Sequence, residues 1–323
     1  MNKLILVVSG EPYGIFNEIF LKALNDSEVK KINSPIILIG SERLLSKQMK
    51  KIGFNKKINL IDRNNIELKN LSKKKINLIN INFEFKKAFD KISDKSNEYI
   101  SECFDVALKL LKKNKYASLI NGPISKKNFL KTKFLGITEY LASKTNNKNE
   151  VAMLIFNKKL SVSPVTTHLP LKDVHKIISK EKIIKQVKLI KKFYKDKFKK
   201  NPNIAITGLN PHCESNYKSS EEDRIIRPAI NYLIKKKYRV KGPFAADTIF
   251  MKENLKNYDV IVGMYHDQVL TPAKTIFGFS AINITLGLPF IRISPDHGPN
   301  TRMLGRNISD SKSLTKAIKF FNK

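Results

Sequence analysis

Short apolar runs alternate with longer amphipathic stretches along most of the 323-residue chain. In the stretch 181–200, isoleucine, valine, tyrosine and phenylalanine recur at helical spacing with lysines on the opposite face, which predicts a helix packed on a core. The stretch 101–113 predicts a second helix of this kind. The short apolar runs predict buried strands, and the alternation favours an α/β fold with a substantially parallel sheet. The predicted strands are 4–8, 35–39, 117–120, 204–207, 260–264 and 281–285.

Polar, glycine-containing loops follow several of these strands. In α/β folds the carboxyl ends of parallel strands hold the functional sites, so we expect the chemistry there. The chain contains neither G-x-G-x-x-G nor G-x-x-x-x-G-K-[ST], which disfavours a Rossmann dinucleotide site and a P-loop. The lysine- and asparagine-rich stretch 50–80 is interpreted as surface elements. The loops are SGEPYG (9–14), NGP (121–123), GLNPHCE (208–214), MYHDQ (264–268) and SPDHGPN (294–300).

Composition indicates a globular protein of a reducing compartment. Hydrophobic residues make up 41% of the chain and aromatic residues 9%, which is enough for a core. The two cysteines, Cys103 and Cys213, cannot build a disulfide framework. The apolar run near the start is too short for a secretory segment, and no run approaches the roughly 18 apolar residues of a membrane span. We therefore expect a cytoplasmic protein without a membrane partner.

The formal net charge of +33 is large, but its distribution is not that of a nucleic-acid-binding face. Only eight of the 61 basic residues are arginine, and the lysines are spread along the whole chain. Nucleic-acid-binding proteins cluster their basic residues and combine them with aromatic ones. We expect a lysine-rich surface that binds no specific nucleic acid. Its positive field would attract a small phosphorylated, carboxylated substrate.

Four of the five histidines, His168, His212, His266 and His297, lie in predicted loops. The fifth, His175, lies in a lysine-rich helical stretch and is interpreted as a surface residue. Three imidazoles and one open coordination position form a catalytic site for zinc or a similar ion. The histidines are too far apart in sequence for a local metal motif. The residues alone therefore leave open that these histidines are ordinary hydrogen-bonding groups.

Charged and amide side chains near these loops are further candidates. Asp247 and Asp267 could orient an imidazole or act as acid or base, whereas the alternative for Asp247 is a turn or helix cap. Lys274, Asn283 and Arg292 lie in a stretch that is poor in other charges. A lysine and an arginine in such a stretch favour an anion site over a buried ion pair.

Seven segments together resemble one enzyme family. The longest one, in the last quarter of the chain, is very specific, and the segments follow the family's order from residue 10 to about residue 300. The chain therefore resembles the 4-hydroxythreonine-4-phosphate dehydrogenase family of vitamin B6 biosynthesis over nearly its whole length. The segments are GEPYGI (10–15), NGPISK (121–126), TTHLPL (166–171), GLNPH (208–212), GPFAADTIF (242–250), YHDQ (265–268) and GFSAINITLGLPFIRISPDHG (278–298).

The resemblance implies a fold and an assembly. The family has the two-lobed α/β/α architecture of isocitrate and isopropylmalate dehydrogenases, which binds NAD without a Rossmann fingerprint. For this chain it implies an outer lobe of 1–128 plus 265–323 and a middle lobe of 129–264 that carries dimer contacts. The active site would lie in the cleft between the lobes. It would be shared between the two subunits of a homodimer.

The resemblance also implies an activity, which is the oxidation of 4-phosphohydroxy-L-threonine by NAD or NADP. Decarboxylation would follow and give 3-amino-2-oxopropyl phosphate. One divalent ion, Zn²⁺, Co²⁺, Mn²⁺ or Mg²⁺, would be bound by histidines from both subunits. The residues at the matching positions are His168, His212 and His266 for the metal, Asp247 as an acidic residue beside it, and Thr138, Lys274, Asn283 and Arg292 for the substrate.

Three segments depart from the family pattern. The family has G-H-T-E where this chain has G-I-T-E, so Ile137 replaces a substrate-binding histidine. The first motif reads GIFNE instead of G-I-G-P-E, and PN follows SPDHG where the family has T-A. These departures leave two alternatives open. One is a paralogous dehydrogenase of phosphorylated threonate or erythronate, and the other is an inactive basic binding protein on the same fold.

Overall fold

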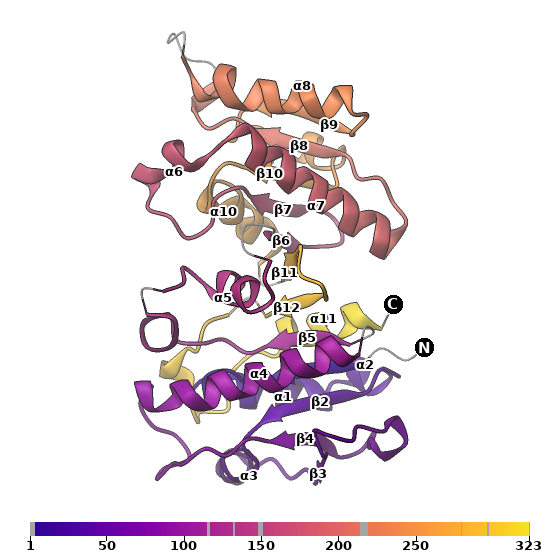
Figure 1. The fold of residues 1–323 in the computed structure, drawn as a ribbon, viewed down its shortest axis with the longest axis vertical. Helices are drawn as coiled ribbons and strands as arrows, with labels where there is room; N and C mark the ends of the chain where they lie inside the picture. The colour runs from indigo at the N-terminus through magenta and orange to yellow at the C-terminus, as the bar shows by residue number, and fades with distance from the viewer. Residues whose placement is uncertain are drawn as a thin grey trace. The chain divides into compact units, whose positions relative to one another are not determined.

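The computed structural model describes residues 4–114, 117–131, 133–147, 151–213, 219–278, 280–295 and 297–322. The last residue of the predicted loop 208–214 and Asp296 of the loop 294–300 lie outside these ranges. The chain forms two compact units, one of Met1–Ile137 with Phe290–Lys323 and the other of Thr138–Pro289. Each unit is an α/β structure with its own set of strands and helices (Figure 1). The predicted α/β class is confirmed.

The sheet of the first unit is parallel at each pairing that the structure describes. Its central strand β1 is completely buried, as expected for a parallel strand covered on both faces. The predicted strands 4–8, 35–39 and 117–120 correspond to β1, β2 and β5. The strand order is β3 (Ile58–Leu60), β4 (Ile76–Asn80), β2 (Ile36–Gly40), β1 (Ile5–Val8), β5 (Ser118–Asn121) and β12 (Arg292–Ser294).

Helix α4 packs against β1, β2 and β5 of this sheet. Its buried face includes Ile100, Phe104 and Leu111, which recur at helical spacing. The helix predicted at 101–113 is therefore confirmed, although it begins earlier. The helices of the unit are α1 (Phe16–Asn25), α2 (Ser27–Lys30), α3 (Glu42–Lys51), η1 (Leu68–Asn70), η2 (Asp94–Ser96), α4 (Asn97–Lys113), η3 (Lys126–Leu130), η6 (Thr301–Met303) and α11 (Lys312–Phe321).

The stretch 50–80 does not consist of surface elements alone, and that prediction was wrong for its last residues. Ile76, Leu78 and Ile79 of β4 are buried because β4 pairs with β2 on one side and β3 on the other. The lysines at 73–75 precede the strand and are exposed. They give the segment a polar composition that hides a short interior strand.

The sheet of the second unit is mixed. Strand β6 pairs antiparallel with β11 and β7, whereas β7, β10, β8 and β9 form a parallel set. The predicted strands 204–207, 260–264 and 281–285 correspond to β8, β10 and β11. The strand order is β11 (Ile282–Leu286), β6 (Ala152–Phe156), β7 (Ser161–Pro164), β10 (Val260–Gly263), β8 (Ile204–Thr207) and β9 (Val240–Phe244).

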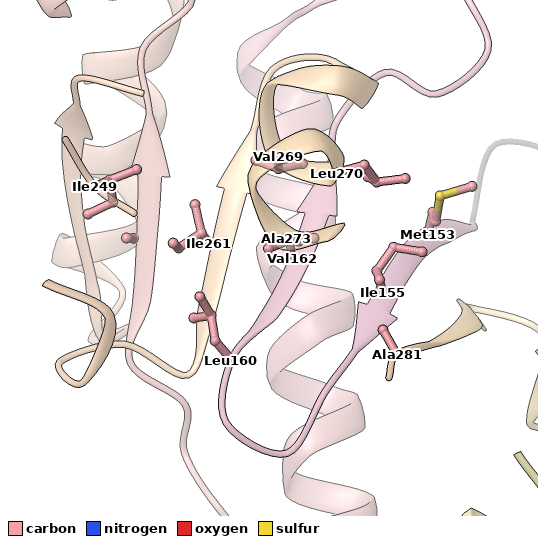
Figure 2. Close-up of a cluster of buried hydrophobic side chains, with 11 residues drawn as sticks. Met153, Ile155, Leu160, Val162, Ile249, Ile261, Val269, Leu270, Ala273 and Ala281 are labelled. Atoms are coloured by element: carbon pink, nitrogen blue, oxygen red, sulfur yellow. The ribbon is translucent and has the colours of Figure 1, made fainter. Parts of the chain in front are cut away.

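Helices α7 and α10 cover opposite faces of this second sheet (Figures 1 and 2). Figure 2 shows Val269 and Ala273 of α10 over Val162 of β7 and near Ile261 of β10. The predicted helix 181–200 corresponds to α7. The helices of the unit are α5 (Ile137–Lys144), α6 (Leu171–Ile177), α7 (Lys180–Phe198), η4 (Pro211–Cys213), η5 (Glu222–Ile226), α8 (Arg227–Lys235), α9 (Lys252–Leu255) and α10 (His266–Phe277).

The units divide the chain at other positions than the predicted lobes. Residues 265–289 were expected in the outer lobe, but they belong to the second unit. The reason is local packing, since α10 packs on β7 and β10 while β11 pairs with β6. Within the described residues, no helix combines the length and the apolar character needed to cross a bilayer.

Candidate functional site

Three of the predicted site histidines follow three neighbouring parallel strands. His168 follows β7, His266 follows β10 and His212 follows β8. Strand β10 lies between β7 and β8 and is parallel to both. Since the carboxyl ends of parallel strands lie at the same edge of a sheet, the three histidine-bearing segments begin side by side. Segments that are about 50 to 100 residues apart in sequence thus meet at one edge.

The ring centroids of His168 and His266 are 6.0 Å apart, at an interplanar angle of 38°. His266 is the first residue of α10, and 35% of its side chain is exposed. Its Nδ1 lies 2.6 Å from Oδ1 of Asp267. The sequence left open whether Asp267 orients an imidazole or acts as acid or base, and this contact is of the kind that orients an imidazole.

Backbone hydrogen bonds connect the exits of β7 and β10. The carbonyl of Met264 accepts hydrogen bonds from the Thr166 hydroxyl at 2.8 Å and the Thr166 amide at 3.2 Å. The Val165 amide donates to the Gly263 carbonyl at 2.8 Å. Thr166 is buried and lies two residues before His168, while Met264 lies two residues before His266. This contact therefore sets the starting points of both histidine segments.

His212 differs from the other two because its side chain is exposed and its backbone is left-handed, with φ at 59° and ψ at 4°. The loop that carries it is bound to the carboxylate of Glu222. Oε1 of Glu222 accepts from the amides of Leu209 at 2.7 Å and Asn210 at 2.9 Å, and its Oε2 accepts from Nδ2 of Asn210 at 2.9 Å. Burial acts to raise the pKa of Glu222, but the hydrogen bonds from Asn210 and Leu209 hold it below the ordinary value.

The positions of His168, His212 and His266 bear on the predicted divalent-ion site. Three imidazole nitrogens suit zinc and similar ions. Two imidazoles that share one ion have ring centres roughly 5 Å apart, given metal–nitrogen distances of about 2.1 Å. The His168–His266 pair at 6.0 Å is near this value. Across the described residues of the single chain, no three histidine, cysteine or acidic side chains come close enough to bind one ion. The three-histidine site therefore stays a prediction.

Asp247 lies in the turn that follows β9, the outermost strand of the parallel set. Its side chain is exposed. Burial raises the pKa of the Cys213 thiol, and the negative charges of Glu222 and Asp247 raise it further. Asp247 is thus close enough to the end of the histidine loop for its charge to be felt there. The position agrees with a turn residue as well as with an acid near the site.

The predicted substrate residues are distributed over both units. In the second unit, Thr138 is buried with its Oγ1 3.4 Å from Oγ1 of Thr285, Asn283 is half-buried on β11, and Lys274 is exposed on α10. In the first unit, Arg292 is fully buried on β12 and Ile137 is half-buried at the start of α5. Thr138 of α5 contacts Thr285 of β11, and β11 also carries Asn283. Both residues therefore lie near the antiparallel strands of this unit.

Residue patterns did not single out Glu11 in the first unit. Glu11 follows β1, and its amide donates to the carbonyl of Pro123, which follows the neighbouring strand β5. Its side chain is only 2% exposed. Burial raises its pKa to about 7, although the Ser96 hydroxyl and the backbones of Ser125 and Tyr13 act to lower it. The only sequence signal was an acidic residue next to an apolar strand, in the loop 9–14.

Comparisons with known proteins give the family. A model of the family described as Pyridoxal phosphate biosynthetic protein PdxA matches residues 31–321. The chain belongs to this family. A relative from a Sulfurihydrogenibium species, named 4-hydroxythreonine-4-phosphate dehydrogenase, is 40% identical over 97% of this chain and 96% of its own. A relative from Oceanobacillus iheyensis, whose name gives D-threonate 4-phosphate as its candidate substrate, is 32% identical over 98% and 96%.

Solved structures agree with the family and with its fold. The crystal structure of 4-hydroxythreonine-4-phosphate dehydrogenase from Klebsiella pneumoniae is 28% identical and covers 99% of this chain and 98% of its own, with a TM-score of 0.85. Isocitrate dehydrogenase from Methylococcus capsulatus is similar in fold alone, with 9% identity, a TM-score of 0.50, and coverage of 98% and 83%. The predicted likeness to the isocitrate dehydrogenase fold is confirmed.

Proposed function

We propose that the protein is a dehydrogenase that oxidises 4-phosphohydroxy-L-threonine in pyridoxal phosphate biosynthesis. The observation that carries the proposal is the row of His168, His266 and His212 at the carboxyl edge of β7, β10 and β8, in a member of the PdxA family. The 40% identical relative carries the name of this activity. The +33 net charge favours capture of a substrate with a phosphate and a carboxylate.

We propose NAD, or NADP in its place, as the hydride acceptor. The oxidised product would lose carbon dioxide to give 3-amino-2-oxopropyl phosphate. A divalent ion, Zn²⁺, Co²⁺, Mn²⁺ or Mg²⁺, would supply Lewis-acid polarisation of the substrate hydroxyl when bound. His168, His212 and His266 would hold it. A homodimer in which both subunits supply ligands would complete a set that the described residues of one chain do not bring together.

The other side chains would bind the substrate and move its protons. Asp247 is exposed and could take up the hydroxyl proton. Lys274 is exposed on α10 and suits the phosphate, whereas Thr138 and Asn283 suit the polar groups between the two anionic ends. Arg292 suits a carboxylate by its planar guanidinium, but its complete burial beside Asn121 makes it the member of the set that the structure supports least.

The test is an assay of NADH formation with purified full-length protein after loading with each divalent ion. The substrates are 4-phosphohydroxy-L-threonine, D-threonate 4-phosphate and D-erythronate 4-phosphate. We expect turnover of 4-phosphohydroxy-L-threonine with release of carbon dioxide. Mass spectrometry should identify the other product as 3-amino-2-oxopropyl phosphate. His212→Ala and His266→Ala should remove metal and turnover together. The exposed His175 on α6 offers a matched control, since His175→Ala should retain both.

Two results would contradict the proposal. Turnover of D-threonate 4-phosphate alone would favour the paralogous dehydrogenase. The name of the 32% identical relative gives this compound as its candidate substrate. No turnover with any substrate, ion or nicotinamide cofactor would favour an inactive binding protein. The shared site has its own test, in which two inactive variants are refolded together. Regained activity in the mixture, but in neither variant alone, is expected if both subunits of a homodimer contribute ligands.

A further inference from the structure

Gln268 is a buried amide in the first turn of α10, two residues after His266. Its Oε1 accepts hydrogen bonds from the Met264 amide at 2.7 Å and from the Thr207 hydroxyl at 2.9 Å. Its Nε2 donates to the Gly208 carbonyl at 2.8 Å. The side-chain amide of Gln268 thus makes three hydrogen bonds, and each partner lies outside α10.

These partners lie at the ends of two strands. Met264 directly follows β10 and precedes His266, whereas Thr207 is the last residue of β8 and Gly208 begins the loop that carries His212. Gln268 therefore bridges the exit of β10 and the exit of β8 with one rigid side-chain group. Backbone pairing between these strands ends at Val262 and Ile206, so the amide replaces the ladder where the sheet stops.

The surrounding packing leaves this bridge little room to shift. A Cβ at Gly263 would lie within 2.9 Å of Oε1 of Gln268 and within 2.4 Å of Cγ1 of Val269. Only glycine accommodates so close an approach. Val269, the next residue of α10, is completely buried in the hydrophobic core of the unit (Figure 2). The helix is thus anchored on the sheet directly beside the amide.

The residues that directly follow Gly208 in the His212 loop are held by a second side chain. Glu222 binds the amides of Leu209 and Asn210, as described above. The loop is therefore fixed to η5 by Glu222 and to the start of α10 by Gln268. Glu222 holds the amides of Leu209 and Asn210, and Gln268 links Gly208 to the segment that carries His266.

We propose that Gln268 is a positioning residue that holds the His212 loop and His266 in a fixed relation for metal binding. The proposal rests on the metal site proposed above and assigns to it a group that touches neither the metal nor the substrate. Groups that orient metal ligands in this indirect way change metal affinity by about 10- to 100-fold when they are removed. A purely structural amide would lower stability without changing the affinity of the folded protein.

The experiment compares Gln268→Met with Gln48→Met. Methionine has a similar volume and no comparable hydrogen-bonding group. Gln48 is buried in the first unit and also makes three hydrogen bonds, to the carbonyls of Pro12 and Ala88 and from Nδ2 of Asn17. Co²⁺ affinity is measured by competition with a chelator, at a temperature where thermal melts show both variants folded. We expect a loss of about 10- to 100-fold for Gln268→Met and an unchanged affinity for Gln48→Met.

A double-mutant cycle tests whether the effect passes through His212. In a His212→Ala background, Gln268→Met should have little further effect on Co²⁺ affinity, and the visible Co²⁺ spectrum of Gln268→Met should shift toward that of His212→Ala. If Gln268→Met does not fold, Thr207→Val removes one of the three hydrogen bonds in a buried strand position. A smaller loss in the same direction is then expected.

The outcomes separate this role from the metal site itself. Wild-type protein that binds no Co²⁺ would overturn the metal site and this role with it. If the wild type binds Co²⁺ and both Gln268→Met and Thr207→Val bind it with the affinity of the wild type, the positioning role of Gln268 is overturned while the metal site stands. A full effect of Gln268→Met in the His212→Ala background would also overturn it, because the amide would then act on another ligand.

Discussion

The Nε of Arg292 donates a 2.7 Å hydrogen bond to Oδ1 of Asn121, and both side chains are buried at the pairing of β12 with β5. Asn121 ends β5 and also donates from Nδ2 to the carbonyl of Gly122 at 2.8 Å. A cation that is completely removed from water depends strongly on such a contact. Arg292 itself lies in the interior of the first unit, on β12.

Asn121→Ala should therefore lower the free energy of unfolding. A hydrogen bond to a charged group contributes about 1.5–3 kcal/mol, and its loss leaves the guanidinium with one acceptor fewer. Asn121→Asp keeps an acceptor beside Arg292 and should recover a large part of this loss. Urea denaturation followed by circular dichroism measures both variants. Equal stability of Asn121→Ala and the wild type would show that the contact contributes nothing.

Glu222 should make the second unit sensitive to acid. Its pKa lies below the ordinary value of 4.5 in the folded protein because, although burial opposes it, the hydrogen bonds from Asn210 and Leu209 favour the anion. The stabilisation is therefore present above the unfolded pKa and is lost as the pH falls through the folded one. Glu222→Gln should be less stable than the wild type at neutral pH. The difference in unfolding free energy should shrink as the pH falls below the ordinary value of 4.5.

Glu11 should have the opposite pH dependence. Burial raises its pKa from 4.5 to about 7, so between these values the folded protein binds a proton that the unfolded chain releases. Stability should therefore fall as the pH rises through this window. Glu11→Gln, which keeps the shape without the charge, should gain stability relative to the wild type from about pH 5 to about pH 8. Urea denaturation across this range measures the change, with Glu222→Gln as a control whose difference from the wild type should stay constant there. A constant difference would show that Glu11 does not titrate there.

The local pattern predicted strands well where they are apolar on both faces. The run 204–207 corresponds to β8 with the same ends, because all four of its residues are buried between parallel neighbours. The same rule failed for β4, whose buried Ile76 and Leu78 stand next to a run of exposed lysines. Hydrophobic periodicity reports the average surroundings of a window, and a strand of this length is shorter than the window.

The sequence named the candidate residues of the site, but it could not predict how the segments that carry them are arranged. Loop histidines after strands indicated the edge of a sheet, yet only the insertion of β10 between β7 and β8 makes His266 the central one. That order is a property of long-range pairing and leaves no local signal. The left-handed backbone of His212 and the bridge made by Gln268 also depend on groups distant in sequence, such as Glu222 and Thr207.

Ile137 stands where the resemblance to the family implies a substrate-binding histidine. Its side chain is half-buried at the first position of α5, directly before the buried Thr138. Isoleucine offers no hydrogen bond, whereas a histidine could donate one to an anionic group of the substrate. Such a bond contributes about 1.5–3 kcal/mol, which is about 10- to 150-fold in affinity.

If the substrate is 4-phosphohydroxy-L-threonine, Ile137→His should lower KM for it by up to this factor and leave the metal content unchanged. Ile137→Leu has nearly the same volume and no donor, so it should change neither value. If the true substrate is D-threonate 4-phosphate, Ile137→His should instead lower kcat/KM for that compound, because a polar imidazole would enter an apolar contact. Steady-state kinetics with both compounds distinguish the two cases. Unchanged kinetics in both Ile137→His and Ile137→Ala would show that this position does not face the substrate, and the substrate-binding role proposed for Thr138 would then be withdrawn as well.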